Sequence, residues 1–385
     1  MSRPLADSSI DGERQPPSEW MQRALDAAEH ARGTTGSNPW VGAVLVQDGS
    51  LVAEAATGPP GGPHAEAAVL RDSDCRGASL YVTLEPCAPF PDKRTPPCSE
   101  AIARAGVRRV VVALPDPDPR VAGRGLQTLR DAGVAVEVGD GYHAALKQLR
   151  PYVKHRQTGL PYVIAKYASS LDGRAATVAG ESQWITGPEA RELVHLARSK
   201  VDAILVGSGT VMTDDPQLTA RPGGVLSPRQ PLRVVLDGRG RTLPDARLLT
   251  VPGDVLLVTS RFSNPDWREA IAEAGAEILV CEASPPNVPL DLVLETLGAR
   301  GFVSLWVEGG GQLLGSLFEG GHVDELWAFL APLIIGGDGR AAVGRAGVHM
   351  LTEVHALNDV TVERVANDVL IRGYTSSIDE PPLPS

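Results

Sequence analysis

Aromatic residues and positive charge are both scarce in this sequence. Phe, Trp and Tyr make up 4 % of its 385 residues, and the formal net charge at pH 7 is −11. Proteins that bind nucleic acid broadly rely on a basic surface with aromatic side chains for stacking, so the composition disfavours that class. A small phosphorylated ligand stays compatible with it, because a few arginines suffice to hold one phosphate.

Cysteines and long apolar runs are scarce as well. The 4 cysteines are too few for a disulfide-stapled secreted domain. The first residues are polar and contain no apolar signal core, and no apolar run approaches the roughly 20 residues that a membrane span needs. The sequence therefore predicts a cytoplasmic protein that does not associate with a membrane.

The length predicts two domains, since one domain usually takes about 100–200 residues. We expect residues 18–152 to form the first domain and residues 160–375 the second, with the boundary near residues 151–161, which include the polar run Lys154–Gln157. Residues 1–17 are predicted to be disordered, and the acidic, proline-rich residues 376–385 are predicted to form a loose tail.

Both halves alternate between helical and strand patterns, which predicts an α/β fold, with a mostly parallel sheet covered on both faces in the second half. In the first half the expected strands are 40–46, 80–84, 109–114 and 134–138, and the expected helices are 20–31, 66–70, 99–105 and 126–132. In the second half the expected strands start near Tyr162 and continue with 203–206, 233–236, 255–258, 277–280, 303–307 and 325–330.

The first half contains the residues of a catalytic zinc site. His64 lies just before a predicted helix, Cys87 follows a predicted strand, and Cys98 comes shortly afterwards. One imidazole and two thiolates provide three zinc ligands and leave the fourth tetrahedral position for water. Glu66 follows the histidine closely and is well placed to pass a proton from that water to a leaving amine, as in zinc deaminases.

Each of these residues also has an ordinary explanation. A lone histidine after a Gly-Gly-Pro turn is usually a surface residue, and two cysteines can be unrelated buried thiols. Their combination at the ends of predicted strands and helices favours the zinc site. Cys75 and Cys281 have no such context, and we expect them to be ordinary small side chains.

The second half contains a glycine-rich turn, Val307–Ser316, in which a strand passes through glycines into a helix. Glycines let a backbone approach a ligand closely, and the N–H groups at a helix N-terminus bind phosphate. Such a turn can equally serve tight packing, and it lacks the G-x-G-x-x-G spacing of a Rossmann fold.

Four further residues of the second half are candidates with open alternatives. Arg198 and Arg221 are the best phosphate clamps, although single arginines are usually solvated surface residues. Asp214 and its neighbour could be a turn or a helix cap, and Trp184 could simply belong to the core.

Several motifs of the first half carry a resemblance to a known family. Asn38–Val44 reads NPWVGAV, Arg94–Cys98 reads RTPPC, and Asp116–Gly125 contains DPDP and VAGRG. With the His-Ala-Glu and Pro-Cys motifs they resemble the cytidine-deaminase-like zinc enzymes and, more narrowly, the bifunctional riboflavin biosynthesis family RibD. The resemblance implies that His64, Cys87 and Cys98 bind Zn²⁺, that Glu66 is the proton donor, and that Asn38 helps to hold a pyrimidine.

The motifs of the second half resemble the reductase domain of the same family, which has a dihydrofolate-reductase-like fold. They are Lys166–Gly173, Glu181–Gly187, Val206–Thr210, Thr213–Pro216 and Val307–Ser316. The NADPH contacts that the resemblance implies are Ala168, Trp184, Thr210, Asp214, Gly310, Gly311, Gln312, Leu313, Leu314, Gly315 and Ser316. The substrate contacts that it implies are Ser182, Arg198, Leu218, Arg221 and Glu308.

The resemblance also implies two successive reactions on one small pyrimidine ribonucleotide. The first is the zinc-dependent hydrolytic deamination of 2,5-diamino-6-ribosylamino-4-pyrimidinone 5′-phosphate. The second is the NADPH-dependent reduction of the ribosyl group to ribityl. A homodimer is the oligomeric state that the family implies.

The sequence departs from the family pattern between the two cysteines. The loop of 10 residues, Ala88–Pro97, is longer than is usual in the family and lacks the usual histidine. This departure keeps open a second hypothesis, in which a working reductase stands beside a non-catalytic deaminase-like half. A third hypothesis, a base deaminase acting on nucleic acid with the second half binding RNA, conflicts with the acidic, aromatic-poor composition.

Overall fold

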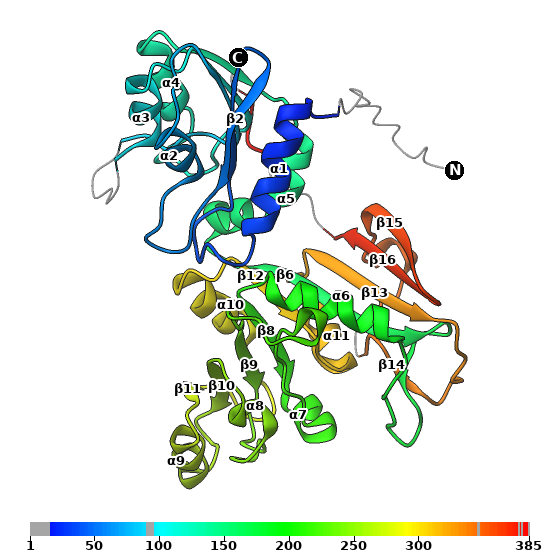
Figure 1. Ribbon diagram of the computed structural model, residues 1–385. Coiled ribbons are helices and arrows are strands. Elements are labelled where there is room, and N and C mark those ends of the chain that lie inside the picture. Colours follow the sequence, from blue (N-terminus) through cyan, green and yellow to red (C-terminus); the bar gives the residue numbers. More distant parts are fainter. Residues whose placement is uncertain (1–15, 90–95, 345–346, 376–377, 379, 384–385) are drawn as a thin grey trace. The chain divides into compact units, whose positions relative to one another are not determined.

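The structure is a computed structural model that describes residues 16–89, 96–344, 347–375, 378 and 380–383. The chain divides into two compact units, Met1–Arg150 with Glu380–Ser385, and Pro151–Asp379 (Figure 1). The predictions for residues 1–15 and for part of the tail lie outside the described residues. Among the described helices, none combines the length and the apolar character that crossing a membrane requires.

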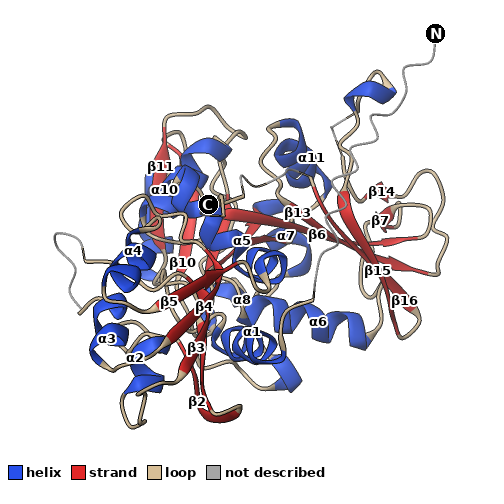
Figure 2. Cartoon of the chain, turned by 90° about the horizontal axis from the view of Figure 1, so that it is seen from above, coloured by secondary structure: helices blue, strands red, loops and turns tan. Residues whose placement is uncertain are grey.

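The first unit is built on a sheet whose strand order, within the described residues, is β2-β1-β3-β4-β5 (Figure 2). The strands are β1 (Gly42–Gln47), β2 (Ser50–Ala56), β3 (Ser79–Leu84), β4 (Arg109–Leu114) and β5 (Ala135–Val138). The helices are α1 (Glu19–Ala31), α2 (Ala65–Leu70), α3 (Cys98–Arg104), α4 (Arg124–Asp131) and α5 (Tyr142–Thr158). β1 pairs antiparallel with β2 and β3, whereas β3, β4 and β5 are parallel.

Local sequence explains the elements at the start of this unit. The Ser18 side chain accepts a hydrogen bond from the Met21 N–H at 3.3 Å and so caps α1. The sequence prediction missed β2, which follows a tight Asp48-Gly49 turn as the edge strand of the sheet. Most residues of β2 are exposed, and its sequence therefore lacks the apolar signal of a buried strand.

The second unit is built on a larger sheet with the order β11-β10-β9-β8-β12-β6-β13-β16-β15 within the described residues. Its strands are β6 (Tyr162–Ser170), β8 (Ala203–Gly207), β9 (Leu232–Leu236), β10 (Val255–Ser260), β11 (Glu277–Cys281), β12 (Ser304–Val307), β13 (Glu325–Ala331), β15 (Asn358–Val365) and β16 (Asp368–Tyr374). The small pair β7 (Arg174–Ala176) and β14 (Arg340–Ala341) stands apart. The pairings from β11 to β13 are parallel, as predicted.

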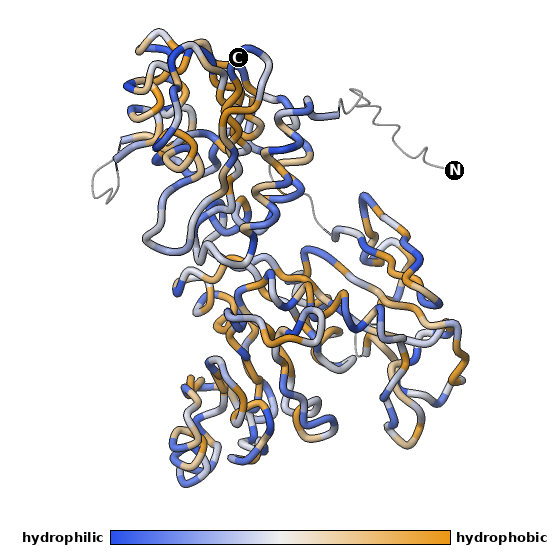
Figure 3. Tube along the Cα trace, in the orientation of Figure 1, coloured by the Kyte–Doolittle hydropathy of each residue, from blue (hydrophilic) through white to orange (hydrophobic). Residues whose placement is uncertain are grey.

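Helices cover both faces of this sheet. One core contains Ile164, Ile204 and Trp306 and receives apolar residues from α6 to α9. The other contains the alternate strand residues, among them Val163 and Leu305, and receives residues from α10 and α11. The orange segments of Figure 3 follow these buried strands. The helices are α6 (Pro188–Ser199), α7 (Ser208–Asp214), α8 (Arg247–Thr250), α9 (Pro265–Glu273), α10 (Leu290–Ala299) and α11 (Gly311–Glu319), with short 3₁₀ turns η1 (Pro222–Gly224) and η2 (Leu351–Glu353).

The polar segment Lys154–Gln157, near which the sequence predicts the domain boundary, is part of a helix. α5 runs through it, and the division of the chain after Arg150 falls inside that helix. Lys154 pairs with Asp324, and the His155 Nε2 lies 3.1 Å from the Gly298 carbonyl oxygen. The polar side chains have partners within the second unit, and so the segment is ordered despite its composition.

The C-terminal residues also differ from the prediction of a loose tail. The Tyr142 hydroxyl donates to the Pro381 carbonyl oxygen at 2.7 Å, and Pro381 is buried. Burial beside Glu380 raises the pKa of Tyr142 to about 12. Residues 380–383 therefore belong to the first unit, although they follow the second in sequence.

We expect Gly298→Ala to destabilise the second unit. A Cβ at this position would lie 1.9 Å from the Gly159 carbonyl oxygen, so backbone would have to move. Overpacking of this kind lowers the free energy of unfolding by about 1–3 kcal/mol. Scanning calorimetry measures the shift, and Gly337→Ala is the control, because Gly337 is exposed and has no atom within 4 Å of its added Cβ. Equal melting temperatures for the two variants would contradict the expected clash.

Candidate functional sites

Three predicted metal ligands converge in the first unit. His64 precedes α2, Cys87 lies just beyond β3, and Cys98 is the first residue of α3. The His64 Nδ1 lies 3.6 Å from the Cys87 Sγ and 3.4 Å from the Cys98 Sγ. The Cys98 main-chain N–H also points at the Cys87 Sγ, at 3.3 Å, and such a donor stabilises a thiolate.

These distances fit a tetrahedral zinc ion. Zinc binds sulfur at about 2.3 Å and imidazole nitrogen at about 2.0–2.1 Å, which places tetrahedral sulfur and nitrogen ligands about 3.6 Å apart. The ligand atoms of the three residues all lie within 4.8 Å of one another. One imidazole and two sulfurs also match zinc chemically, since soft thiolates and borderline imidazoles are its preferred ligands.

Glu66 lies beside this cluster on the first turn of α2 and is 3 % exposed. Burial and the charge of Cys87 raise the pKa of Glu66 to about 7, while His64 and a hydrogen bond with Cys98 act in the opposite direction. A carboxyl group in this range exchanges protons readily near neutral pH, which suits a general acid–base role.

The loop that carries Asn38 was also predicted to belong to this site, and strand pairing places it at the same edge of the sheet. β1 runs antiparallel to β3, so its first residue, Gly42, lies beside the end of β3 and donates to the Thr83 Oγ1 at 3.0 Å. Asn38 belongs to the loop just before β1, and its side chain is exposed. The Thr35 hydroxyl donates to the Asn38 carbonyl oxygen at 2.8 Å and orders this loop. The middle of the long loop between the cysteines, residues 90–95, lies outside the described residues.

Glu85 organises the backbone next to Cys87, and sequence reasoning missed it. Its carboxylate is 3 % exposed and accepts four main-chain N–H groups, from Asp116, Gly123, Gly125 and Leu126, at 2.9–3.3 Å. A Cβ at Gly125 would lie 1.9 Å from the Pro86 carbonyl oxygen. The VAGRG motif therefore needs glycine to pack against the loop that presents Cys87. The sequence signal that could have identified Glu85 is its position, as an acidic residue between an apolar strand and the metal ligand Cys87.

We expect Glu85→Gln to weaken zinc binding. In the variant, the side-chain NH₂ group would face two main-chain N–H groups, which are also donors. These buried groups would then have no hydrogen-bond partner, and the loop that carries Cys87 would be less ordered. Loss of such a supporting group typically lowers metal affinity about 10–100-fold. Competition with a zinc chelator measures this, and Glu54→Gln on the exposed edge strand is the control. Unchanged zinc affinity would show that the four hydrogen bonds do not position Cys87.

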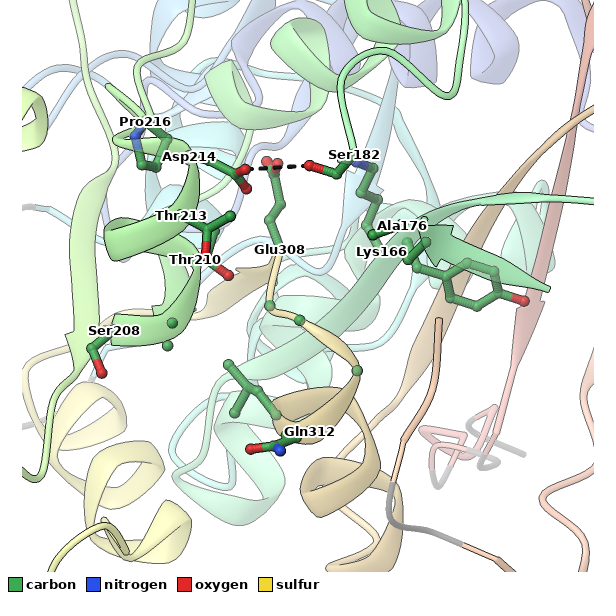
Figure 4. A pocket seen from close by; sticks show the side chains of 18 of the residues that line it. Lys166, Ala176, Ser182, Ser208, Thr210, Thr213, Asp214, Pro216, Glu308 and Gln312 are labelled. Atoms are coloured by element: carbon green, nitrogen blue, oxygen red, sulfur yellow. Dashed lines mark hydrogen bonds between the residues drawn. The ribbon is translucent and has the colours of Figure 1, made fainter. Parts of the chain in front are cut away.

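A cavity of about 1430 Å³ opens in the second unit at the carboxyl ends of its parallel strands (Figure 4). β6, β8 and β12 pair in parallel, so the segments that follow them meet there. Most predicted cofactor residues line the cavity: Ala168, Trp184, Thr210, Asp214, Gly310, Gly311, Gln312, Leu313 and Ser316. All the substrate residues predicted in the second half line it as well: Ser182, Arg198, Leu218, Arg221 and Glu308.

Two residues of the predicted glycine-turn contacts lie elsewhere. Leu314 is fully buried in the core beneath α11, and Gly315 is buried beside it. Helical periodicity explains this, because α11 turns one face toward the cavity and the other toward the sheet. A side-chain contact from Leu314 to a ligand in the cavity is not supported.

Arg198 lines the cavity and is paired with a carboxylate, and its role as a phosphate clamp stays a prediction. Its Nε and one terminal nitrogen bind the Glu308 carboxylate at 2.6 and 2.8 Å, and the other donates to the Thr219 carbonyl oxygen. Burial alone would raise the pKa of Glu308, but Arg198 and Lys166 outweigh it and lower that pKa to about 2. Arg198 thus holds Glu308 charged at the cavity wall. Among the described ion pairs none includes Arg221, whose side chain contacts Gln217.

Trp184 lines the cavity instead of belonging to the core. It is 69 % exposed, and the Arg191 guanidinium stacks over its ring at 4.4 Å. Figure 4 places Ser182 opposite Asp214, and the Ser182 hydroxyl donates to the Asp214 carboxylate at 3.3 Å.

Several cationic side chains of the cavity were not predicted from the sequence. Lys166 faces it from β6, and burial lowers its pKa. A lysine within an otherwise apolar strand was a usable signal. His195 lines the same wall, where burial and the neighbouring Arg198 lower its pKa. Arg239 and Arg241 follow β9 in an ordinary-looking loop, and only the fold directs them to the cavity.

Comparison with protein families assigns both halves. Residues 161–371 match the family described as the RibD C-terminal domain. Residues 14–114 match the family described as the cytidine and deoxycytidylate deaminase zinc-binding region.

Individual relatives extend over both halves. The riboflavin biosynthesis protein RibD of Chlamydia pneumoniae is 41 % identical over 331 residues, which cover 85 % of this chain and 88 % of that protein. The protein of the same name from Escherichia coli K12 is 38 % identical over 364 residues, which cover 91 % of this chain and 97 % of that protein.

Solved structures agree with the sequence comparisons. A structure of Acinetobacter baumannii RibD is 37 % identical, covers 92 % of this chain and 97 % of its own, and has a TM-score of 0.82. A Thermotoga maritima structure titled diaminohydroxyphosphoribosylaminopyrimidine deaminase/5-amino-6-(5-phosphoribosylamino)uracil reductase is 32 % identical with the same coverage and a TM-score of 0.80.

Proposed function

Because the chain belongs to the RibD family of bifunctional riboflavin biosynthesis enzymes, we propose specific roles for its residues in the two reactions. The first unit deaminates 2,5-diamino-6-ribosylamino-4-pyrimidinone 5′-phosphate. The second unit reduces the ribosyl group of the deaminated product to ribityl. The convergence of His64, Cys87 and Cys98 beside the buried Glu66 is the observation that carries the proposal.

In the first unit, His64, Cys87 and Cys98 hold zinc, which when bound activates water for attack on the amine-bearing ring carbon. The Glu66 carboxylate accepts a proton from the water and returns it to the departing amine, so that ammonia leaves and a carbonyl replaces it. Asn38, in the loop beside the end of β3, contacts the pyrimidine ring. The intact ligand set and the buried Glu66 support this role over a non-catalytic deaminase-like half.

In the second unit, the cavity holds NADPH, which when bound supplies the reducing equivalents for the ribosyl group. Gly310 and Gly311 line the cavity at the start of α11, where the main-chain N–H groups of a helix N-terminus can donate to a cofactor phosphate. Trp184 provides an exposed aromatic surface for a planar ring. Arg221 is the residue that we assign to the substrate phosphate, since Arg198 is bound to Glu308.

Mass spectrometry of the diaminopyrimidinone nucleotide incubated with zinc-loaded protein tests both reactions. We expect replacement of one amino group by a carbonyl without NADPH, and a further gain of two hydrogens with it. Glu66→Gln should bind zinc but slow ammonia release by about 10²–10⁴-fold, the usual contribution of a general acid–base group. The same variant should still reduce supplied deaminated substrate. Full ammonia release by Glu66→Gln would remove this residue from the mechanism.

The finer features that the family implies are also part of the proposal. We infer a homodimer that works in the cytoplasm on small molecules and does not bind nucleic acid. The formal net charge of −11 supports the last point. Light scattering of the purified protein tests the assembly, and a monomeric mass at working concentration would contradict it.

A further inference from the structure

One end of the cavity in the second unit carries two arginines without an assigned role. Arg239 and Arg241 lie in the turn that follows β9, and both side chains are exposed and line the cavity. A terminal nitrogen of Arg241 donates to the Ser208 Oγ, at the start of α7, at 2.8 Å. The Arg241 guanidinium therefore faces the segment that follows β8, which is the strand next to β12 and its glycine-rich turn.

The turn that presents these arginines is rigid. Asp237 is fully buried, and its Oδ2 accepts from the main-chain N–H groups of Arg241 and Thr242 and from the Thr242 hydroxyl, each at 2.7–2.8 Å. Gly240 has a φ of +68° and packs on the Trp267 ring, where a Cβ would lie 2.9 Å away. The backbone between the two arginines is thus held in one conformation before any ligand binds.

This end of the cavity lies apart from the reacting end. In Figure 4 Ser208 and Gln312 occupy one side of the pocket, and the hydrogen-bonded pair Ser182 and Asp214 occupies the other. The Glu308 carboxylate appears next to the Ser182–Asp214 pair in this view. A dinucleotide with its redox ring near Trp184 or Asp214 and its pyrophosphate at that turn would extend its adenosine toward Ser208.

The residues around the arginines suit an adenosine. The loop after β11 contributes Pro286 and Val288 to the same cavity, and α10 contributes its first residue, Leu290, which gives an apolar wall for a base. Gly238 packs against this loop, since a Cβ there would lie 2.6 Å from the Pro286 carbonyl oxygen. The arginine turn and the apolar wall therefore form one contiguous surface.

We propose that Arg239 and Arg241 bind the phosphate on the adenosine 2′ position of NADPH and so set the preference for NADPH over NADH. This inference rests on the proposed reductase function. Recognition of an unphosphorylated ribose usually uses an acid that accepts from its hydroxyls. The acid of this turn, Asp237, is fully buried and its Oδ2 atom is bound by the turn, so it is not accessible to a ribose, whereas guanidinium groups match a phosphate dianion in charge and geometry.

Calorimetric titration with adenosine 2′,5′-bisphosphate and adenosine 5′-monophosphate tests the assignment without relying on turnover. We expect Arg239→Ala and Arg241→Ala each to weaken binding of the bisphosphate and of NADPH about 10–100-fold, as the loss of a charged hydrogen bond does. Affinity for the monophosphate and for NADH should change less than about twofold. Arg241→Lys keeps the charge and should fall between wild type and Arg241→Ala.

Arg261→Ala is the matched control, because this arginine is 55 % exposed, pairs with Glu282 and lies outside the cavity lining. It should bind all four ligands as the wild-type protein does. Equal losses for the phosphorylated and unphosphorylated ligands, or no loss in the alanine variants, would overturn the assignment of the arginines alone. Failure of the wild-type protein to bind NADPH at all would overturn the reductase proposal as well.

Discussion

Parallel pairing of neighbouring strands is the constraint from which both sites follow. In the first unit Leu84 pairs with Leu114, so the segments carrying Glu85, Cys87 and the VAGRG motif leave the sheet at one edge. In the second unit Val307 pairs with both Ala165 and Leu205, so the start of α7 and the glycine-rich turn leave the sheet beside Lys166 of β6. Side chains that are distant in sequence meet because parallel strands end at the same edge.

Buried carboxylates fix the conformation of the segments that leave the sheets at these edges. Glu85 accepts from main-chain donors, Glu308 from Arg198 and the Trp306 indole, and the Oδ2 atom of Asp237 from its own turn. An unpaired charge in such a position would be strongly unfavourable, so each carboxylate fixes the conformation of the segment that it binds. At both sites, therefore, a group that touches the ligand is supported by a buried acid in a neighbouring segment.

The two sites make different demands on the fold. A zinc ion needs three donor atoms within a few ångströms of one another, and short elements next to one sheet edge meet that demand. A dinucleotide and a phosphorylated substrate need an extended cavity with several cationic side chains, which the wider sheet provides. The separate sheets allow one chain to combine a compact metal site with a long binding cavity.

Much of this protein was predictable from local sequence. The strands β8, β10 and β12 are buried and mainly apolar, and the glycine-rich turn is typical of a strand followed by a phosphate-binding helix. The metal ligands were predictable because their residue types and their places at element ends are specific to zinc chemistry. The exposed strands β2 and β15 and the polar part of α5 were not predictable, since contacts with other elements stabilise them and their own patterns do not.

The sequence by itself determined which residue types are present for each reaction. The first half supplies an imidazole, two thiols and an acid, and the second half supplies a glycine-rich turn and several arginines. Only the tertiary structure decided which of them act together. It bound Arg198 to Glu308, turned Leu314 into the core and brought Arg239 and Arg241 to the cavity. Side-chain partners across a sheet depend on strand order and helix orientation, and no local pattern in the sequence encodes them.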